Sequence, residues 1–385
     1  MSTRGARVIE FQAVTKRYDD GTVAVDHLDL TIEDGKITVF VGPSGCGKTT
    51  SLRMINRMID ATSGAILLDG KDIRAQHPAD LRRGIGYVIQ NAGLFPHRTV
   101  LDNVATVPML LGARKAAARG RAAELLATVG LPAELGKRYP AQLSGGQQQR
   151  VGVARALAAD PPVLLMDEPF SAVDPVVRDD LQDELLRLQS ELGKTIVFVT
   201  HDIDEAIKLG DQVAVLRVGG RLAQYDTPAA LLAKPVDDFV ASFVGRDRGY
   251  RALGFLPARQ VPIGPVASVP LGTPADVARG RLDAGWAVVV DTENKPLGWV
   301  SEAVLSEVDG EIRPEHLISG GSLYVADAEA SGTAGTLRNA LDAALSSPAA
   351  VGIAVDATGA VVGGVTAETV LKALADARRS GEVPT

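Results

Sequence analysis

Cysteine and aromatic residues are scarce in this sequence of 385 residues. It contains one cysteine, Cys46, which excludes an internal disulfide framework and fits a reducing compartment. Aromatic residues make up 4% of the chain, too few for the stacking platforms that bind single-stranded nucleic acid. The formal net charge is −7, whereas nucleic-acid-binding proteins normally present a basic face. We therefore expect no nucleic-acid partner.

Long apolar runs are also missing. The apolar stretches at residues 37–41 and 163–166 have the length of a strand, far below the roughly 20 residues of a membrane-spanning helix. Residues 1–4 lead into polar sequence without an apolar core, so we expect no secretory signal. With 46% apolar and 23% charged residues, the composition is typical of soluble globular proteins. At roughly 100–200 residues per domain, the length predicts two or three domains of an intracellular protein.

Strands and helices are expected to alternate between residues 8 and 245. Short strands separated by turns fill residues 8–41, and an Ala- and Leu-rich helical pattern covers residues 99–157. Apolar strands that alternate with helices predict a parallel sheet covered on both faces. The strands are predicted at residues 163–166, 195–200 and 212–217, and the helices between them at residues 175–191 and 202–209.

The C-terminal part contains an internal repeat. Residues 288–291 (VVVD) recur as 353–356 (IAVD), and residues 298–301 (GWVS) recur as 363–366 (GGVT), both at a spacing of 65 residues. Two copies of a strand–turn–strand–helix unit predict a pseudo-symmetric pair that buries a shared face. The mixed-charge, glycine-containing segment 246–254 precedes the repeat, and we predict that it is a linker.

A glycine-rich loop follows the strand predicted at residues 37–41. Residues 42–49 (GPSGCGKT) fit the phosphate-binding P-loop pattern, and a helix is predicted to follow them. The glycines allow backbone N–H groups to converge on phosphate oxygens, and the helix N-terminus adds partial positive charge. Lys48 is placed to reach the β- and γ-phosphates, and the Thr49 hydroxyl is a candidate Mg²⁺ ligand. The loop therefore predicts a nucleotide site.

Cys46 lies within this loop, beside Lys48 and a helix N-terminus. Both features stabilise a thiolate and lower a thiol pKa. We therefore expect Cys46 to be reactive, although its thiol is not expected to take part in catalysis.

Two carboxylates end the apolar strand predicted at residues 163–166. Carboxylates at the tip of a buried strand are costly unless they meet a cation or water. Asp167 is therefore a candidate Mg²⁺ partner, directly or through water. Glu168 is the candidate general base for an attacking water.

A second anion-binding helix start is predicted at Ser144. Residues 144–147 (SGGQ) precede a helix predicted over residues 148–158. A serine followed by two glycines offers a hydroxyl, free N–H groups and the helix dipole to an anion. One chain with two such sites either binds two nucleotides or completes the site of a partner in a dimer.

Together these motifs resemble those of the ATP-binding subunit of an ABC transporter, over about residues 8–245. Residues 143–147 (LSGGQ) are similar to the signature motif of that family. The resemblance implies an α/β fold with a P-loop NTPase (RecA-like) core and parallel sheet, an antiparallel β subdomain and a helical subdomain. It also implies a head-to-tail homodimer that holds two ATP molecules, with Mg²⁺, between the P-loop of one subunit and the signature motif of the other.

The resemblance assigns roles to single residues. Gln90 matches the Q-loop glutamine that contacts Mg²⁺ or water, and His201 matches the switch histidine that contacts the γ-phosphate. Tyr18 resembles the aromatic residue that stacks on adenine, and residues 171–174 resemble the D-loop. The expected catalytic residues are Glu168, His201 and Gln90, and the expected metal ligands are Thr49, Gln90 and Asp167. The expected ATP contacts are Tyr18, Gly42, Pro43, Ser44, Gly45, Cys46, Gly47, Lys48, Thr49, Thr50, Ser144, Gly145, Gly146, Gln147 and Asp174.

Two further resemblances narrow the transported substrate. Residues 90–100 resemble the importer branch for glycine betaine, carnitine and choline, and the repeated tail resembles the tandem CBS domains characteristic of that branch. The expected division is a nucleotide-binding domain at 1–245, a linker at 246–254, and CBS domains at 255–320 and 321–380. An ABC ATPase for another small-molecule importer, or one that does not transport, is the alternative.

The resemblance also implies partners and a location. Transmembrane permease subunits and an extracytoplasmic substrate-binding protein or domain are expected, with this chain peripheral at the cytoplasmic face of the inner membrane. The CBS pair is expected to regulate, with a nucleotide as its candidate ligand. Ser301 and Thr366 match the hydroxyl position of CBS domains, but the acidic residues that follow depart from the CBS pattern. Trp286 and Trp299 are expected to pack against core strands and not to form a cage for a quaternary amine.

Overall fold

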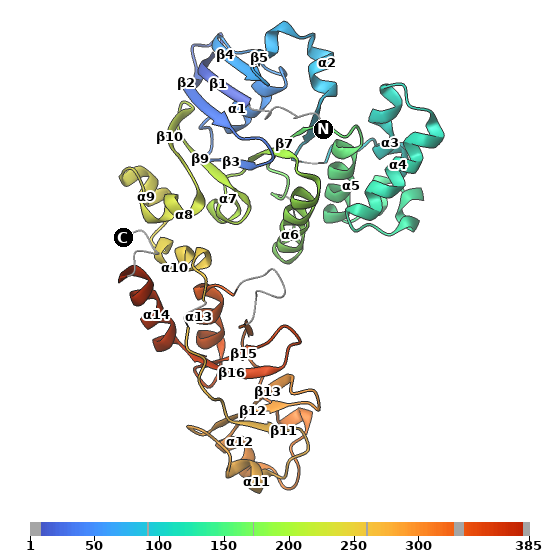
Figure 1. Cartoon of the computed structure of the whole chain (residues 1–385). Helices are drawn as coiled ribbons and strands as arrows, with labels where there is room; N and C mark the ends of the chain where they lie inside the picture. The colour runs from blue at the N-terminus through green and yellow to red at the C-terminus, as the bar shows by residue number, and fades with distance from the viewer. Residues whose placement is uncertain (1–8, 91, 172, 259–260, 327–334, 380–385) are drawn as a thin grey trace, which may run out of the picture. The chain divides into compact units, whose positions relative to one another are not determined.

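In a computed structural model, the chain divides between residues 244 and 245 into two compact units (Figure 1). The structure describes residues 9–90, 92–171, 173–258, 261–326 and 335–379. Residues 1–4, Val8, Asn91 and Ala172, which fall in segments discussed above, lie outside these ranges. Within them, none of the helices combines the length and the apolar character that crossing a membrane requires.

The first unit begins with an antiparallel sheet of strand order β2-β1-β4-β5. In β2, Leu28, Leu30 and Ile32 are buried, whereas Asp29 and Thr31 between them are exposed. Because side chains alternate between the two faces of a strand, this pattern gives the sheet one apolar face that packs on the core. The strands are β1 (Ile9–Arg17), β2 (Val23–Ile32), β4 (Ser63–Leu68) and β5 (Lys71–Asp72).

The second sheet of this unit has six strands in the order β10-β9-β3-β8-β7-β6. Every residue of β3, β7 and β8 is buried, as expected for strands covered on both faces. Neighbouring strands are parallel, except that β10 runs antiparallel to β9, so the predicted parallel sheet is confirmed. The strands are β3 (Ile37–Val41), β6 (Ile85–Val88), β7 (Val163–Asp167), β8 (Thr195–Val199), β9 (Gln212–Arg217) and β10 (Arg221–Asp226).

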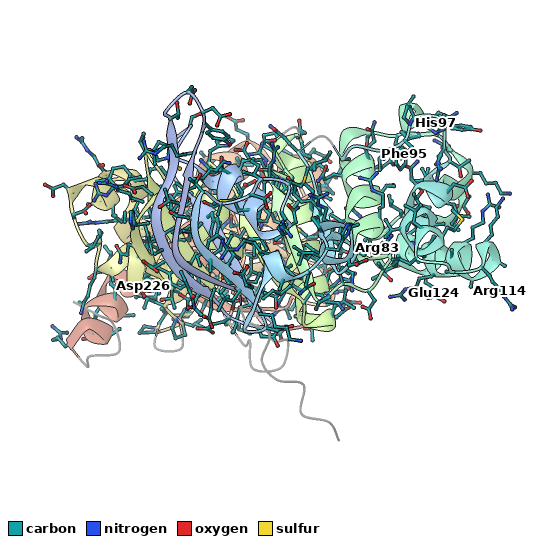
Figure 2. The ribbon with its side chains drawn as sticks, turned by 90° about the horizontal axis from the view of Figure 1, so that it is seen from above. Arg83, Phe95, His97, Arg114, Glu124 and Asp226 are labelled. Atoms are coloured by element: carbon teal, nitrogen blue, oxygen red, sulfur yellow. The ribbon has the colours of Figure 1, made fainter. Side chains whose placement is uncertain are left out.

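Helices connect the strands of the first unit. The Ala- and Leu-rich segment forms a helical region, which Figure 2 shows to one side of the sheets with Phe95, His97, Arg114 and Glu124 at its surface. Within it, the buried Asn103 carboxamide fixes the loop before α3, because it accepts from Phe95 N–H at 2.7 Å and donates to three carbonyls. The helices are α1 (Lys48–Ile55), α2 (Pro78–Arg83), α3 (Val100–Leu110), α4 (Lys115–Thr128), α5 (Gly145–Leu157), α6 (Pro175–Leu192), α7 (Ile203–Leu209), α8 (Pro228–Ala233) and α9 (Asp238–Val244).

The second unit contains two three-stranded sheets, β11-β12-β13 and β14-β15-β16. Val288 pairs with Trp299 in one sheet and Ile353 with Gly364 in the other, so the registers repeat at the spacing seen in the sequence. Trp299, which is 2% exposed, packs with Ile353 of the other copy, and the predicted shared face is confirmed. The elements are β11 (Ser268–Pro270), α11 (Ala275–Arg279), β12 (Trp286–Val290), β13 (Pro296–Ser301), α12 (Glu302–Glu307), β14 (Tyr324–Val325), α13 (Leu337–Ser346), β15 (Val351–Val355), β16 (Val361–Thr366) and α14 (Ala367–Arg379).

The two tryptophans of this unit pack against each other, and the hydroxyls at matching positions of the repeat accept hydrogen bonds at helix starts. The Trp286 and Trp299 rings meet edge to face with centroids 6.4 Å apart, as expected for core packing. The Ser301 hydroxyl caps α12 by accepting from Val304 N–H, and the Thr366 hydroxyl accepts from Thr369 N–H in the first turn of α14.

The segment predicted as a linker is helical. Residues 246–254 include α10 (Arg248–Ala252) and the start of a 3₁₀ turn (Leu253–Phe255). Leu253 is buried in the core of the second unit, and Tyr250 packs against that core. Two apolar side chains three positions apart share a helix face, and this face binds the segment to the unit despite its glycines and charges.

Candidate functional site

The glycine-rich loop connects β3 to α1 and lines a cavity of about 590 Å³. Gly47, the residue before α1, has φ 94°, and a Cβ there would collide with the carbonyl oxygen of Ala24. Because this N-cap residue is glycine, the first N–H groups of α1 have no side-chain cap and are available to a phosphate. The cavity is lined by Ala24, Gly42, Pro43, Ser44, Gly45, Cys46, Gly47, Lys48, Thr49, Thr50, Glu168, His201 and Phe243.

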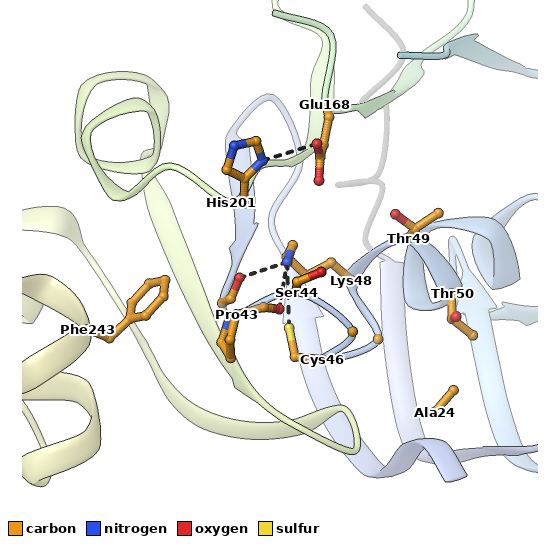
Figure 3. A pocket seen from close by; sticks show the side chains of 13 residues that line it. Ala24, Pro43, Ser44, Cys46, Lys48, Thr49, Thr50, Glu168, His201 and Phe243 are labelled. Carbon is orange, nitrogen blue, oxygen red and sulfur yellow. Dashed lines mark hydrogen bonds and ion pairs between the residues drawn. The ribbon is translucent and has the colours of Figure 1, made fainter. Parts of the chain in front are cut away.

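The loop's own carbonyl groups hold the Lys48 ammonium group. Lys48 is 5% exposed, and its Nζ donates to the carbonyls of Gly42 at 2.7 Å and Pro43 at 3.1 Å (Figure 3). A buried ammonium group is costly without such partners. The cation is therefore fixed inside the loop, where a phosphate group would meet it.

The pKa of the Cys46 thiol differs from the lowered value expected from the sequence. The side chain is fully buried, with Sγ 3.8 Å from Lys48 Nζ. Burial raises the pKa of this thiol, and this effect exceeds the opposite effect of the Lys48 charge. The expectation of a lowered thiol pKa was wrong because it counted the nearby positive charge and not the loss of water.

Asp167 ends β7 beside the start of α1. It is 6% exposed, and its Oδ1 accepts a hydrogen bond of 2.8 Å from the Thr49 hydroxyl. Its Oδ2 accepts a hydrogen bond of 3.3 Å from the Tyr87 hydroxyl and lies 3.4 Å from Arg53 Nη2. The predicted Thr49 and Asp167 are thus brought together, and their hard oxygen donors suit Mg²⁺.

Glu168 follows Asp167 and turns into the cavity. Its φ of 45° lies in the left-handed region, which costs a non-glycine residue on the order of 1–3 kcal/mol. The carboxylate Oε2 lies 3.1 Å from Nδ1 of His201, the second residue after β8 (Figure 3). The strained backbone therefore aims a carboxylate at an imidazole next to the phosphate loop.

The other predicted site residues lie outside the lining of this cavity. Tyr18 and Gln90 are exposed, and Lys16 Nζ lies 5.2 Å from the centroid of the Tyr18 ring. At the start of α5, Ser144 and Gln147 form a capping box: Ser144 Oγ accepts from Gln147 N–H at 3.3 Å, and Gln147 Oε1 accepts from Ser144 N–H at 3.0 Å. Asp174 directly precedes α6 and is exposed. The helix starts at Lys48 and Gly145 are thus two separate places in one chain.

Sequence reasoning missed four residues at the site. Ala24 and Phe243 line the cavity, and no local pattern marks either of them. Arg53 and Tyr87 contact Asp167. Arg53 follows Thr49 by four positions, so a helix begun at the phosphate loop would have placed both on one face.

The comparisons with known proteins agree with this geometry. A family model described as "ABC transporter" matches residues 25–171. The osmoprotectant import ATP-binding protein OsmV of Salmonella typhimurium is 48% identical over 292 residues, which cover 74% of this chain and 76% of that protein. The chain belongs to the family of ABC transporter ATP-binding proteins.

Other relatives within this family carry names of quaternary amines. The carnitine transport ATP-binding protein OpuCA of Listeria monocytogenes is 53% identical over 241 residues, covering 63% of this chain and 60% of that protein. The glycine betaine/carnitine/choline transport ATP-binding protein OpuCA of Bacillus subtilis is 52% identical, with 63% of each chain covered. The match thus spans less than two thirds of the length of both OpuCA proteins.

Solved structures match the first unit's fold. The ATP-binding cassette MJ0796 bound to ADP and Pi, described as a dimeric post-hydrolysis state, is 33% identical with a TM-score of 0.53, covering 57% of this chain and 98% of that one. The cbiO1 protein of Clostridium perfringens is 31% identical with a TM-score of 0.55, covering 59% and 90%. The predicted P-loop NTPase core is therefore confirmed, and the CBS assignment of the repeated unit stays a prediction.

Proposed function

We propose that this chain is the ATP-hydrolysing subunit that powers import of a quaternary-amine compatible solute of the glycine betaine, choline, carnitine or proline type. The observation that carries the proposal is the Glu168–His201 pair, 3.1 Å apart at the cavity of the phosphate loop. The names of the relatives, which include carnitine, glycine betaine and choline, support the substrate class.

Different residues at the cavity have different roles in the proposed hydrolysis of ATP. Backbone N–H groups of the loop and Lys48 bind the β- and γ-phosphates. Glu168 orients the attacking water and accepts its proton, and His201 holds Glu168 and contacts the γ-phosphate. Thr49 and Asp167, with Gln90, would hold Mg²⁺, which neutralises charge on the phosphates when bound.

A head-to-tail homodimer completes each site in this proposal. Ser144, Gly145, Gly146 and Gln147 lie outside the cavity of their own chain, and the partner's copy of this helix start would bind the γ-phosphate. Tyr18 would stack on adenine, and Asp174 would contact the partner. The description of MJ0796 as a dimeric cassette supports this arrangement.

The proposal includes further partners. Transmembrane permease subunits would carry the solute across the membrane, an extracytoplasmic binding protein or domain would deliver it, and this chain would lie at the cytoplasmic face of the inner membrane. Residues 255–320 and 321–380 would form a regulatory CBS pair whose candidate ligand is a nucleotide. The observed repeat of strand registers supports a paired unit.

Hydrolysis by the purified chain tests the proposed activity. ATP turnover that requires Mg²⁺ and is lost in Lys48→Ala is expected. A wild-type chain that binds ATP but releases no phosphate, alone and with its copurified membrane partners, would contradict the proposal.

A further inference from the structure

Three buried polar side chains form a hydrogen-bonded network behind His201. Glu205, on α7, is 6% exposed, and its Oε2 accepts a hydrogen bond of 2.6 Å from the Thr200 hydroxyl. Its Oε1 accepts a hydrogen bond of 3.3 Å from the Gln182 amide on α6. Thr200 and Gln182 are 2% and 3% exposed. Burial raises the pKa of Glu205, so this contact between α6 and α7 carries a desolvation cost that an apolar contact would not.

The network fixes the backbone on both sides of His201. The Thr200 N–H donates to the carbonyl of Phe40 in β3 at 3.1 Å, and Thr200 Oγ1 accepts from the Asp202 N–H at 3.0 Å. The same hydroxyl donates to Glu205, which therefore sets its orientation. Glu205 lies outside the lining of the cavity, and its partner Thr200 directly precedes His201.

The other end of the network is α6. Arg178, one turn before Gln182, lies 4.0 Å from Asp202 Oδ2 and donates to the carbonyl of Val173 at 3.2 Å. Helix α6 therefore contacts the segment around His201 at two places and the segment before its own start at one. A shift of α6 would therefore change the support of the segment that carries His201.

We propose that Glu205 is a positioning residue for His201. Through Thr200 it holds the imidazole against Glu168, and through Gln182 it ties this geometry to α6. The inference rests on the proposed function, because it assumes that the cavity hydrolyses ATP. It predicts an effect on the rate of hydrolysis and not on ATP binding.

Steady-state ATP hydrolysis by the purified full chain tests the proposal. Glu205→Ala is expected to lower kcat about 10- to 100-fold, the scale of a misplaced catalytic group. The KM for ATP should change less than about twofold, because the cavity lining is intact. Adding Glu205→Ala to His201→Ala should cause no further loss, since both changes act through one group. Glu205→Gln should restore most of the rate, because the Gln182 amide can turn to match the new amide.

Strand β8 provides a matched control. Thr195, the first residue of β8, is 1% exposed; its hydroxyl donates to Asp34 Oδ1 at 2.9 Å and accepts from Gly35 N–H at 2.9 Å. Thr195→Val and Thr200→Val each remove the hydroxyl of one buried threonine, but only Thr200→Val should lower kcat. If Glu205→Ala does not fold, the comparison of these two threonine variants still tests whether Glu205 positions His201 through Thr200.

The outcomes separate this proposal from the proposed function. A wild-type chain without ATP hydrolysis overturns both. With an active wild type, a normal kcat in Thr200→Val, or effects of Glu205→Ala and His201→Ala that multiply, overturns the positioning role alone.

Discussion

The carboxylate of Glu168 and the imidazole of His201 meet at 3.1 Å, although 33 positions separate the two residues. Each residue follows a different, neighbouring strand of the central sheet, β7 and β8. In parallel sheets the carboxyl ends of the strands share one edge, where ligands bind. The sheet therefore assembles the pair next to the phosphate loop, which follows β3 at the same edge.

Replacing Glu168 with Gln should preserve ATP binding and stop turnover. The amide keeps the size of the side chain but is not a base, and loss of a general base typically costs on the order of 10²–10⁴-fold. Phosphate release under saturating ATP measures the loss, and a fluorescent ATP analogue measures the affinity. Turnover close to that of the wild type would remove Glu168 from the mechanism.

Replacing Ser144 with Arg should abolish hydrolysis in the proposed dimer. The bulky cation would keep the partner's γ-phosphate from the start of α5. Mixing this variant with Lys48→Ala tests whether the two motifs act in trans, because one site of each heterodimer then carries both lesions and the other site is intact. Recovered hydrolysis in the mixture is the expected result. A mixture as inactive as its two components would argue against the shared site.

The Cys46 thiol should alkylate slowly in the folded chain. Burial raises its pKa above the ordinary value, so the thiolate that reacts forms only at more alkaline pH than in a free cysteine, about 8.5. At pH 8 the rate with iodoacetamide should be at least about 10-fold lower than in the urea-unfolded chain. Equal rates would show that the thiol is accessible and ionised.

Truncation after Gly245 should leave ATP hydrolysis intact. The cut falls at the boundary of the two units and removes α10 together with the core it packs against. We expect the truncated chain to lose the response of transport to osmotic conditions. Uptake by the reconstituted transporter across a salt series, with wild type beside the truncation, measures this response. Parallel curves would show that the tail is no sensor, and an inactive truncation would give it a structural role.

The phosphate loop and the Asp167–Glu168 tip could be predicted because short-range patterns encode them. A buried apolar strand, a glycine-rich turn and a helix start are contiguous in sequence, and their chemistry is local. The repeat of the second unit was equally visible, because VVVD and IAVD have the same spacing as GWVS and GGVT, and this comparison requires no tertiary information.

The features that could not be predicted from the sequence depend on tertiary packing. Phe243 reaches the cavity from α9, about 200 positions after the loop, and only the fold brings it there. The pKa of Cys46 is raised because burial by its neighbours outweighs the opposite effect of the Lys48 charge. The helix within residues 246–254 forms because Leu253 packs into the core of the second unit. The glycine content of the segment does not predict this packing.

ATP-dependent solute uptake tests the central claim most directly. The complex copurified on a tag on this chain would be reconstituted in proteoliposomes with ATP inside, and uptake of labelled glycine betaine, carnitine, choline and proline would be compared with that of a sugar. The account predicts uptake of at least one of these four solutes by the wild type, none with Glu168→Gln, and no sugar uptake. Wild-type hydrolysis of ATP without uptake of any of these four solutes, or with uptake of the sugar instead, would contradict it.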